Sequence, residues 1–326
     1  MKEINWGFIG CGDVTEKKSG PAFNKIEGSK ISAVMCRTSS KAKNYAARHN
    51  IPKWYDNADK LIDDPDVNAV YVATPPKFHA EYAIKVMNAG KPVYVEKPMA
   101  ISYKESRKMN EAASITRVHL FVAYYRRSLP YFLKVKELID KESIGIINFI
   151  NIKFWSPPRE EDLNSQNLPW RVIPGISGGG YFYDMACHQL DILDYIFGPV
   201  KHAYGKLANR AGLYKAEDTV SASIEFESGI IAAGSWCFAA DRLNKADSIE
   251  ILGSKGKILF STFSFSPVVV KVGDVITKYM PANPENIQYH LIKDIVEELQ
   301  GTGKSPSDGI SAARTNKVMD MILNKL

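Results

Sequence analysis

The fold class of this 326-residue chain is decided near its start by residues 4–15, INWGFIGCGDVT. The apolar run Asn5–Ile9 predicts a buried strand, and the two glycines after it predict a tight turn. A strand followed by Gly-x-Gly and a helix is typical of a dinucleotide-binding loop, where the backbone approaches a pyrophosphate. The alternative is an ordinary strand–turn–helix corner, since Thr15 replaces the third small residue of that motif. The cofactor contacts predicted in this loop are Gly10, Gly12, Asp13 and Val14.

The residues after this loop alternate between short apolar runs and helical patterns. Further strands are predicted at Lys30–Cys36, Asn68–Thr74, Pro92–Val95 and His119–Ala123. Helices are predicted between them at Ser40–His49, at Phe78–Ala89 and after a capping Ser102. Strand–helix alternation predicts a parallel sheet covered on both faces, and hence an α/β Rossmann dinucleotide-binding domain over residues 1–122.

From residue 123 the pattern changes to closely spaced strands with a few helices. The expected elements are helices at Leu129–Ile139 and Tyr181–Phe197, a strand at Ile146–Trp155, strand patterns across residues 219–272, and two closing helices at Ile287–Gln300 and Asp308–Leu323. We therefore predict a second α/β domain over residues 123–326 with a large, mostly antiparallel open sheet. Apolar strands such as Ile230–Phe238 indicate that this sheet pairs subunits as a homodimer or homotetramer.

Composition excludes several classes of protein. Hydrophobic residues make up 45% and charged residues 24%, as in a globular rather than a disordered chain. The net charge of +6 is too small for a dedicated nucleic-acid binder. The four cysteines form no CxxC pair, so we expect neither a metal site nor a disulfide framework, and a reduced, cytoplasmic compartment. No signal peptide or membrane span is expected.

The end of the second predicted strand bears on the type of dinucleotide. NAD sites carry a carboxylate there for the ribose 2′-hydroxyl, whereas this chain has Cys36 followed by two cations and several hydroxyls. Arg37, Thr38 and Lys41 therefore favour NADP(H), with NAD(H) still possible. The alternative is a solvated loop in which Ser40 merely caps the next helix.

Two further motifs carry candidate catalytic groups. Glu96-Lys97-Pro98 follows a predicted strand, where a lysine can donate to a substrate oxygen. Asp184 and His188 are four residues apart and so share one face of a helix, where the imidazole can exchange protons. Each motif alone also fits a surface turn or a structural ion pair.

In combination and order, these motifs resemble the Gfo/Idh/MocA family, which includes glucose–fructose oxidoreductase and inositol dehydrogenase. The resemblance covers almost the whole chain and includes Ala73-Thr74-Pro75-Pro76, Tyr125-Arg126 and Pro169-Trp170-Arg171. It implies a Rossmann domain followed by a sheet-containing substrate domain. It also implies that Lys97 polarises the substrate oxygen, that His188 is the general acid/base and that Asp184 holds a substrate hydroxyl or orients the reacting groups.

Other candidates depend on the resemblance or on residue type. Contacts with the cofactor are expected from Thr74, Pro75, Pro76, His79, Glu96, Lys97 and Arg126, the last of which reaches either cofactor or substrate. A carbohydrate pocket is expected to involve Trp155, Trp170, Arg171 and Tyr289, together with residues of the stretch 156–175. For Trp155 and Tyr289 a place in the core is equally compatible with the sequence.

Three functions remain open at this point. The first is an NAD(P)-dependent oxidoreductase, with NADP(H) favoured, that acts on a sugar, a sugar derivative or a cyclitol. The second is an NAD-dependent glycosidase that oxidises its substrate transiently, although the chain lacks an acidic ribose clamp. The third is a non-catalytic dinucleotide-sensing regulator on the same fold.

Overall fold

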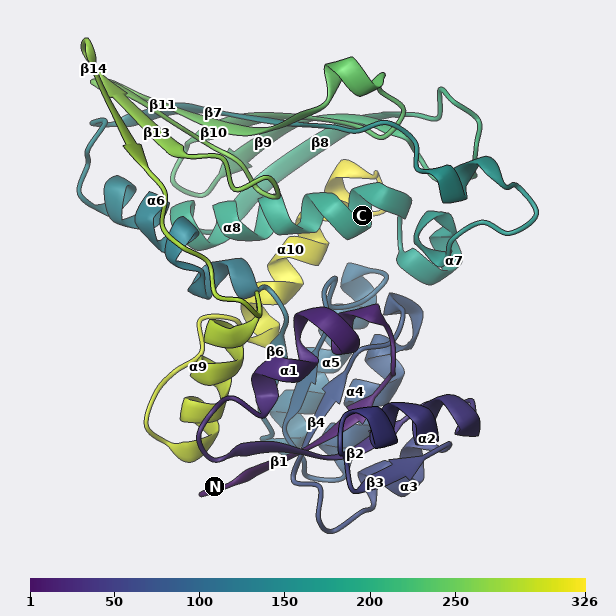
Figure 1. The fold of residues 1–326 in the computed structure, drawn as a ribbon. Coiled ribbons are helices and arrows are strands. Elements are labelled where there is room, and N and C mark those ends of the chain that lie inside the picture. The colour runs from purple at the N-terminus through teal and green to yellow at the C-terminus, as the bar shows by residue number, and fades with distance from the viewer. The chain divides into compact units, whose positions relative to one another are not determined.

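The computed structural model describes residues 1–326, and the chain divides into two compact units (Figure 1). The first unit holds Met1–Leu129 and Pro284–Ala313, and the second holds Pro130–Asn283 and Arg314–Leu326. We assigned all residues after 122 to the second domain, but Pro284–Ala313 returns to the first unit. No helix combines the length and the apolar character needed to cross a bilayer.

The first unit contains a six-stranded, fully parallel sheet. Its strands are β1 Ile4–Ile9, β2 Ser29–Met35, β3 Lys53–Tyr55, β4 Ala69–Val72, β5 Val93–Val95 and β6 Leu120–Val122. Their spatial order is β3-β2-β1-β4-β5-β6, the doubly wound Rossmann order. Because β1 pairs with β2 on one side and with β4 on the other, the topological switch point lies at the carboxyl end of β1. The predicted Rossmann fold is confirmed, whereas the short strand β3 was not predicted.

Helices and short helical turns connect these strands. They are η1 Val14–Lys18, α1 Gly20–Phe23, α2 Ser39–Arg48, α3 Ala58–Ile62, η2 Pro76–Phe78, α4 His79–Asn88, α5 Tyr103–Thr116, η3 Tyr125–Ser128 and α9 Tyr289–Gln300. As predicted, Ser102 caps α5, because its hydroxyl accepts a hydrogen bond from the backbone N–H of Glu105 at 3.3 Å.

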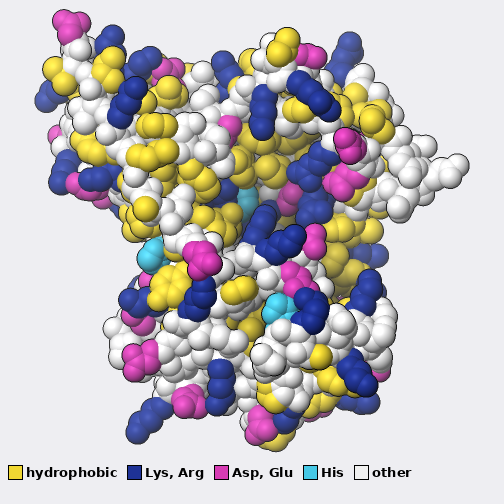
Figure 2. Space-filling view, viewed as in Figure 1, with side chains coloured by type: hydrophobic (Ala, Val, Ile, Leu, Met, Phe, Trp, Pro, Cys, Tyr) yellow, Lys and Arg dark blue, Asp and Glu magenta, His cyan; other side chains and the backbone are white.

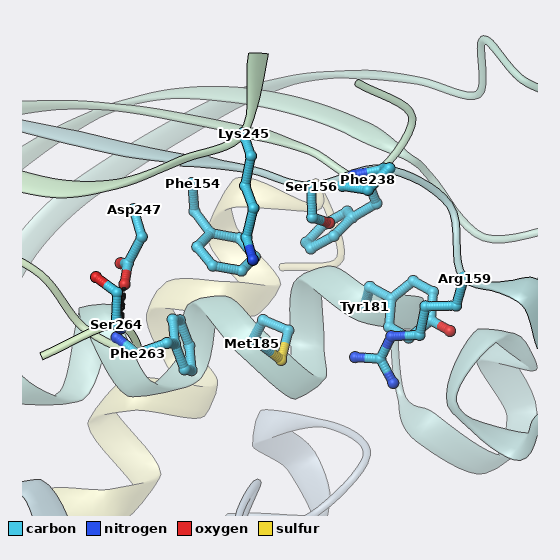
Figure 3. A pocket seen from close by; sticks show the side chains of 11 residues that line it. Phe154, Ser156, Arg159, Tyr181, Met185, Phe238, Lys245, Asp247, Phe263 and Ser264 are labelled. Atoms are coloured by element: carbon cyan, nitrogen blue, oxygen red, sulfur yellow. Dashed lines mark hydrogen bonds between the residues drawn. The ribbon is translucent and has the colours of Figure 1, made fainter. Parts of the chain in front are cut away.

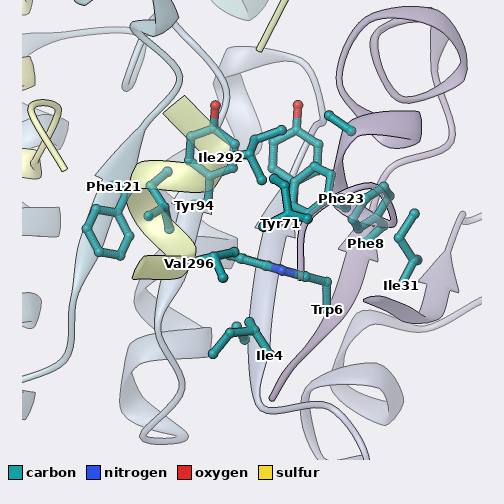
Figure 4. Packing of buried hydrophobic residues seen from close by; sticks show 14 of the residues in the cluster. Ile4, Trp6, Phe8, Phe23, Ile31, Tyr71, Tyr94, Phe121, Ile292 and Val296 are labelled. Carbon is teal, nitrogen blue, oxygen red and sulfur yellow. The ribbon is translucent and has the colours of Figure 1, made fainter. Parts of the chain in front are cut away.

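The core of the first unit explains why α9 belongs to it. Aromatic rings from β1, α1 and β4 pack edge to face, with 4.8 Å between the Phe8 and Phe23 centroids and 5.1 Å between those of Phe8 and Tyr71. The apolar face of α9, which includes Ile292 and Val296, is fully buried in the same cluster (Figure 4). Spacings of three and four residues place these side chains on one helical stripe, which the aromatic cluster covers.

The second unit is built on an eight-stranded sheet in the order β14-β13-β12-β11-β7-β10-β9-β8. Its strands are β7 Ile147–Trp155, β8 Val200–Ala208, β9 Thr219–Phe226, β10 Ile231–Cys237, β11 Ala246–Gly253, β12 Gly256–Phe260, β13 Val268–Val272 and β14 Val275–Tyr279. Only β7 and β10 pair in parallel, so the predicted mostly antiparallel sheet is confirmed. The edge strands β8 and β14 were not predicted, since neither shows a clean apolar alternation.

Helices cover one face of this sheet. They include α6 Pro130–Asp140 and α8 Cys187–Phe197, which run beneath the strands in Figure 1. In β9 the residues facing this layer, such as Val220 and Ile224, are buried, whereas Ser221 and Ser223 on the other face are exposed. In Figure 1 this second face carries no α-helix, although a short helical turn lies above one end of it. On the side of the molecule shown in Figure 2, basic and acidic side chains are interspersed over the surface.

Buried polar contacts hold α8 in place. Trp236 of β10 donates its indole N–H to Gln189 Oε1 at 2.6 Å. The guanidinium of Arg314, in α10 Gly309–Ile322, binds both carboxylate oxygens of Asp194 at 2.8 and 2.7 Å. Asp191 is 1% exposed and accepts a hydrogen bond from the Thr315 hydroxyl at 3.2 Å. These contacts fix the helix that carries His188.

Candidate active site

The loop after β1 has the backbone of a dinucleotide-binding turn. Gly10 adopts φ +118°, and a Cβ there would lie 2.6 Å from the carbonyl oxygen of Ala73, so only glycine fits. A Cβ on Gly12 would meet no protein atom within 4 Å. Nothing within the protein therefore requires glycine at this position, and the open space suits the close approach of a pyrophosphate to the backbone. This loop fits the phosphates of a dinucleotide.

Thr15, which departs from the usual motif, is accommodated inside the turn. Its hydroxyl donates to the carbonyl oxygen of Gly12 at 2.8 Å, and its own carbonyl accepts from the Tyr45 hydroxyl at 2.9 Å. A Cβ on Gly20 would lie 2.0 Å from that carbonyl oxygen. The close approach of α1 to the preceding turn η1 thus depends on the absence of a side chain at Gly20.

Cations follow β2 where an NAD site carries a carboxylate. The guanidinium of Arg37 lies over the Phe78 ring, 5.1 Å from its centroid. Arg37 and Lys41 are both exposed and form no ion pair with a carboxylate. The helix α2 begins at Ser39 with Thr38 as its N-cap residue, so the alternative in which Ser40 caps this helix is wrong.

The turn after β4 contains a buried threonine hydroxyl without a hydrogen-bond partner and a histidine whose two ring nitrogens both face carbonyl oxygens. The Thr74 hydroxyl oxygen is buried without a hydrogen-bond partner, and Pro75 and Pro76 lead into η2. The His79 ring is fully buried, with Nδ1 2.9 Å from the carbonyl oxygen of Pro98 and Nε2 2.7 Å from that of Thr74. Burial lowers the pKa of His79 below its usual value. We predicted a cofactor contact for His79, but its side chain instead joins the two turns.

Glu96, which precedes Lys97, belongs to a buried hydrogen-bond network. Its Oε1 accepts from the Tyr71 hydroxyl at 2.6 Å and from Gln288 Nε2 at 2.7 Å, and its Oε2 accepts from the backbone N–H of Lys97 at 3.1 Å. Burial raises the pKa of Tyr71 well above its usual value, so this hydroxyl remains a donor. Both oxygens of Glu96 are engaged by protein donors. We predicted that Glu96 contacts the cofactor, but in the structure its side chain instead supports the backbone of Lys97.

Gln288 was missed because no motif marks it. It lies at the start of α9, 192 residues after Glu96 in the sequence, and it also accepts from the Tyr94 hydroxyl at 2.8 Å. Tyr289, predicted as a pocket residue, packs at the edge of the core of the first unit. Arg126, in η3 after β6, is buried with its guanidinium 5.0 Å from the centroid of the Tyr125 ring.

In the second unit, Asp184 and His188 lie on the π-turn η6 Phe182–Ala186 and on α8, which directly follows it. Both side chains are buried, and Asp184 Oδ2 lies 3.4 Å from Arg171 Nε. The guanidinium of Arg171 lies over the Trp170 ring at 4.6 Å. The structure thus brings together three of the predicted substrate-contact residues. The His188 ring packs against Phe263, with 5.7 Å between centroids.

A pocket of about 310 Å³ opens beside these residues within the second unit (Figure 3). It is lined by residues from one end of the sheet, from the loops at that end and from the π-turn η6 with its N-cap residue: Phe154, Ser156, Pro157, Arg159, Tyr181, Met185, Phe238, Lys245, Asp247, Phe263 and Ser264. The parallel strands β7 and β10 both end at this edge and β11 begins there, since Trp155 pairs with both Cys237 and Ala246. Ser156, Pro157 and Arg159 of the stretch 156–175 contribute to this lining.

Trp155 does not contribute to this pocket. Side chains alternate along β7, so Phe154 faces the helices and the pocket while Trp155 points to the other face of the sheet. There its indole N–H donates to the Ser235 hydroxyl at 3.1 Å, and the Lys153 ammonium lies 4.8 Å from its ring centroid. The pocket residues Lys245 and Phe263 were missed because they lie in loops without a recognisable motif.

Comparisons with known proteins agree with this architecture. Residues 4–124 match the model described as oxidoreductase family, NAD-binding Rossmann fold, and residues 132–259 match the GFO/IDH/MocA C-terminal domain. The chain is 39% identical to Oxidoreductase P35 of Formosa agariphila over 98% of both chains. It is 25% identical to 1,5-anhydro-D-fructose reductase of Ensifer adhaerens, over 93% of this chain and 90% of the relative.

Among solved structures, a levoglucosan dehydrogenase in complex with NADH and L-sorbose superposes with a TM-score of 0.89 at 22% identity. The match covers all of this chain and 97% of the other. The Rossmann-fold model thus matches the N-terminal part of the chain, and the C-terminal domain model matches the part that follows it. This chain belongs to the Gfo/Idh/MocA family of NAD(P)-dependent oxidoreductases.

Proposed function

We propose that this enzyme is an NADP(H)-dependent oxidoreductase that transfers a hydride between the nicotinamide and a carbinol or carbonyl carbon of a sugar, a sugar derivative or a cyclitol. The observation that carries the proposal is the presence of Lys97 after β5 of a Rossmann sheet, and of Asp184 on η6 and His188 on α8 in the second unit. Membership of an NAD(P)-dependent oxidoreductase family supports it.

The residues at the carboxyl edge of the first sheet fit a nicotinamide dinucleotide. The pyrophosphate would lie against Gly10, Gly12, Asp13 and Val14, and the buried Thr74 hydroxyl offers an otherwise unused polar group. The nicotinamide ring supplies the hydride donor or acceptor. Arg37 and Lys41 would bind a 2′-phosphate, because both are exposed cations without a carboxylate partner.

The protein's own groups would handle the charge and the proton of the substrate oxygen. The Lys97 ammonium would donate to that oxygen and stabilise alkoxide character as it develops. His188 would take up or release the oxygen-bound proton, and Asp184 would hold a substrate hydroxyl. Glu96 and His79 act as positioning residues, because they hold the backbone on both sides of Lys97.

The cofactor assignment predicts the effect of removing both cations. Arg37→Ala/Lys41→Ala should raise the KM for NADP⁺ by about 10-fold to 100-fold, because a 2′-phosphate then loses two charge-assisted contacts. The KM for NAD⁺ should change by less than about 3-fold, since that cofactor has no phosphate at this position. Steady-state kinetics with each cofactor measures both values.

The matched control for this experiment is Arg107→Ala/Lys108→Ala, which removes an exposed Arg and an exposed Lys from α5. It should change neither KM. A wild-type enzyme that prefers NAD⁺, or a double variant with an unchanged KM for NADP⁺, would show that the 2′-phosphate assignment is wrong.

We also infer that the face of the eight-stranded sheet opposite α6 and α8 pairs two copies of the chain. This face exposes large apolar side chains, with Tyr204 of β8 71% exposed and Ile231 of β10 50% exposed. Tyr204→Glu/Ile231→Glu should convert an oligomer into the 36.4 kDa monomer, because charges would be buried unpaired at the interface. Light scattering after size exclusion measures the mass, and a monomeric wild-type protein would contradict the inference.

A further inference from the structure

Two cationic side chains converge on the pocket of the second unit. Lys245 follows the turn η7 Arg242–Asn244 and extends its ammonium over the pocket, and the Arg159 guanidinium approaches from the loop after β7 (Figure 3). The guanidinium lies over the Tyr181 ring, 4.4 Å from its centroid, and this cation–π contact holds it at one wall of the pocket. These cations come from separate segments that meet only because β7 and β11 are neighbours with Trp155 opposite Ala246.

The carboxylate that lines the pocket, that of Asp247, accepts hydrogen bonds from backbone N–H groups. Asp247 accepts from the N–H groups of Thr262 at 2.9 Å, Phe263 at 2.7 Å and Ser264 at 2.7 Å. These bonds occupy both of its oxygens and hold the loop after β12. Asp247 forms no ion pair with Lys245, so it leaves the charge of that ammonium available to a ligand.

Of the two acidic residues near Arg159, Asp162 is engaged by other groups, and Glu161 forms an exposed ion pair with the Arg159 guanidinium. Asp162 is buried behind Tyr181, where it accepts from the Tyr181 hydroxyl at 2.7 Å and from the Arg159 backbone N–H at 2.8 Å. Glu161 lies 3.5 Å from the Arg159 guanidinium, but both side chains are more than two-fifths exposed. Such an exposed pair contributes little, so an incoming anion can replace it.

The rest of the pocket suits the ring of a sugar. Phe154, Phe238 and Phe263 form an aromatic wall, with 4.9 Å between the centroids of Phe154 and Phe263 and 6.0 Å between those of Phe154 and Phe238. Phe263 also contacts His188, and in Figure 3 Arg159 lies across the pocket from Phe263. A volume of about 310 Å³ is at the small end of the usual range for small-molecule sites.

We propose that the substrate is a sugar acid whose carboxylate binds Lys245 and Arg159. Its ring packs against the three phenylalanines, and the carbon that is oxidised or reduced lies at the His188 side of the pocket. The planar guanidinium matches a carboxylate with two parallel hydrogen bonds, and the ammonium adds a point charge. This inference rests on the oxidoreductase function proposed above and specifies its substrate class.

The first experiment compares substrates that differ only in the charged group. Initial rates with NADP⁺ and NAD⁺ are measured for D-glucuronate against D-glucose and for D-galacturonate against D-galactose. We expect kcat/KM to be at least about 10-fold higher for one of the uronates than for its neutral partner. The KM for that uronate should rise with ionic strength, because both cations are solvent-accessible.

The second experiment removes each cation separately. Lys245→Met and Arg159→Gln should each raise the KM for the uronate by about 10-fold to 100-fold and change kcat by less than about 3-fold. The KM for the neutral sugar should stay within about 2-fold of the wild-type value, since the aromatic wall is unchanged. Lys271→Met, an exposed lysine of β13, is the matched control and should change nothing.

Calorimetric titration of the uronate into the same proteins separates this proposal from the one on which it rests. Uronate binding that is abolished in Lys245→Met would support the anion site. If at the same time no sugar changed the nicotinamide absorbance, only the oxidoreductase function would be overturned. Turnover of neutral sugars as efficient as that of uronates, or an unchanged uronate KM in Lys245→Met, would overturn the sugar-acid proposal alone. Absence of both uronate binding and uronate turnover would also overturn it.

Discussion

Lys97→Met should lower kcat by about 100-fold to 1,000-fold while the protein keeps its fold and its affinity for NADP⁺. Methionine preserves most of the length and volume of the side chain but cannot donate to the substrate oxygen. A preorganised charge facing a developing alkoxide contributes this much in a water-poor site. The backbone of residue 97 should not move, because Glu96 holds its N–H and is itself held by Tyr71 and Gln288.

The measurement is steady-state turnover on a substrate that the wild-type enzyme accepts, together with NADPH fluorescence titration for cofactor affinity. Lys108→Met, an exposed lysine on α5, is the matched control and should keep full activity. Lys97→Arg should recover part of the lost kcat, because it restores a cation at the same place. Retention of more than about a third of wild-type kcat by Lys97→Met would remove Lys97 from the mechanism.

His188→Gln should lower kcat by about 100-fold to 10,000-fold, the range expected for the loss of a general acid/base. Glutamine can still donate and accept hydrogen bonds, but it cannot exchange a proton with the substrate. The change should not unfold the second unit. The helix that carries His188 is also held through Gln189, Asp191 and Asp194, whose partners are unaffected.

The comparison with Asp184→Asn distinguishes a chemical role from a binding role. Asp184→Asn should raise the KM more than it lowers kcat, because Asp184 would hold a substrate hydroxyl, whereas His188→Gln should act mainly on kcat. Circular dichroism checks the fold of each variant. His202→Gln, at an exposed position of β8, provides the control. Full activity of His188→Gln would require another residue to carry the proton.

The same assays decide between the functions that the sequence left open. Net change of nicotinamide absorbance accompanies an oxidoreductase reaction. A glycosidase with transient oxidation would release sugar from a synthetic glycoside without that change. A regulator would bind the cofactor without turning over any substrate. The family match favours the first of these, because both domains of the chain match an oxidoreductase family.

Local sequence alone determined the Rossmann domain and the position of its loop. Each of the main strands β1, β2, β4, β5 and β6 is a short apolar run bounded by turn residues, so its place depends on neighbours in sequence. Gly10 could also be recognised early, because a positive φ after a strand requires a residue without a Cβ. Asp184 and His188 were found because helical spacing brings them to one face.

Tertiary structure alone decided which neighbours those groups have. The sequence contains the apolar stripe of α9 but not the aromatic cluster that covers it, which brings Gln288 to Glu96 across 192 residues. Glu96 and His79 resembled cofactor contacts until burial and hydrogen bonds showed that they support the backbone. Strand alternation turned Trp155 away from the pocket, and the pairing of β7 with β11 brought Lys245 and Arg159 together. Local patterns specify elements, whereas a site built from loops depends on strand order and register, which are set by long-range packing.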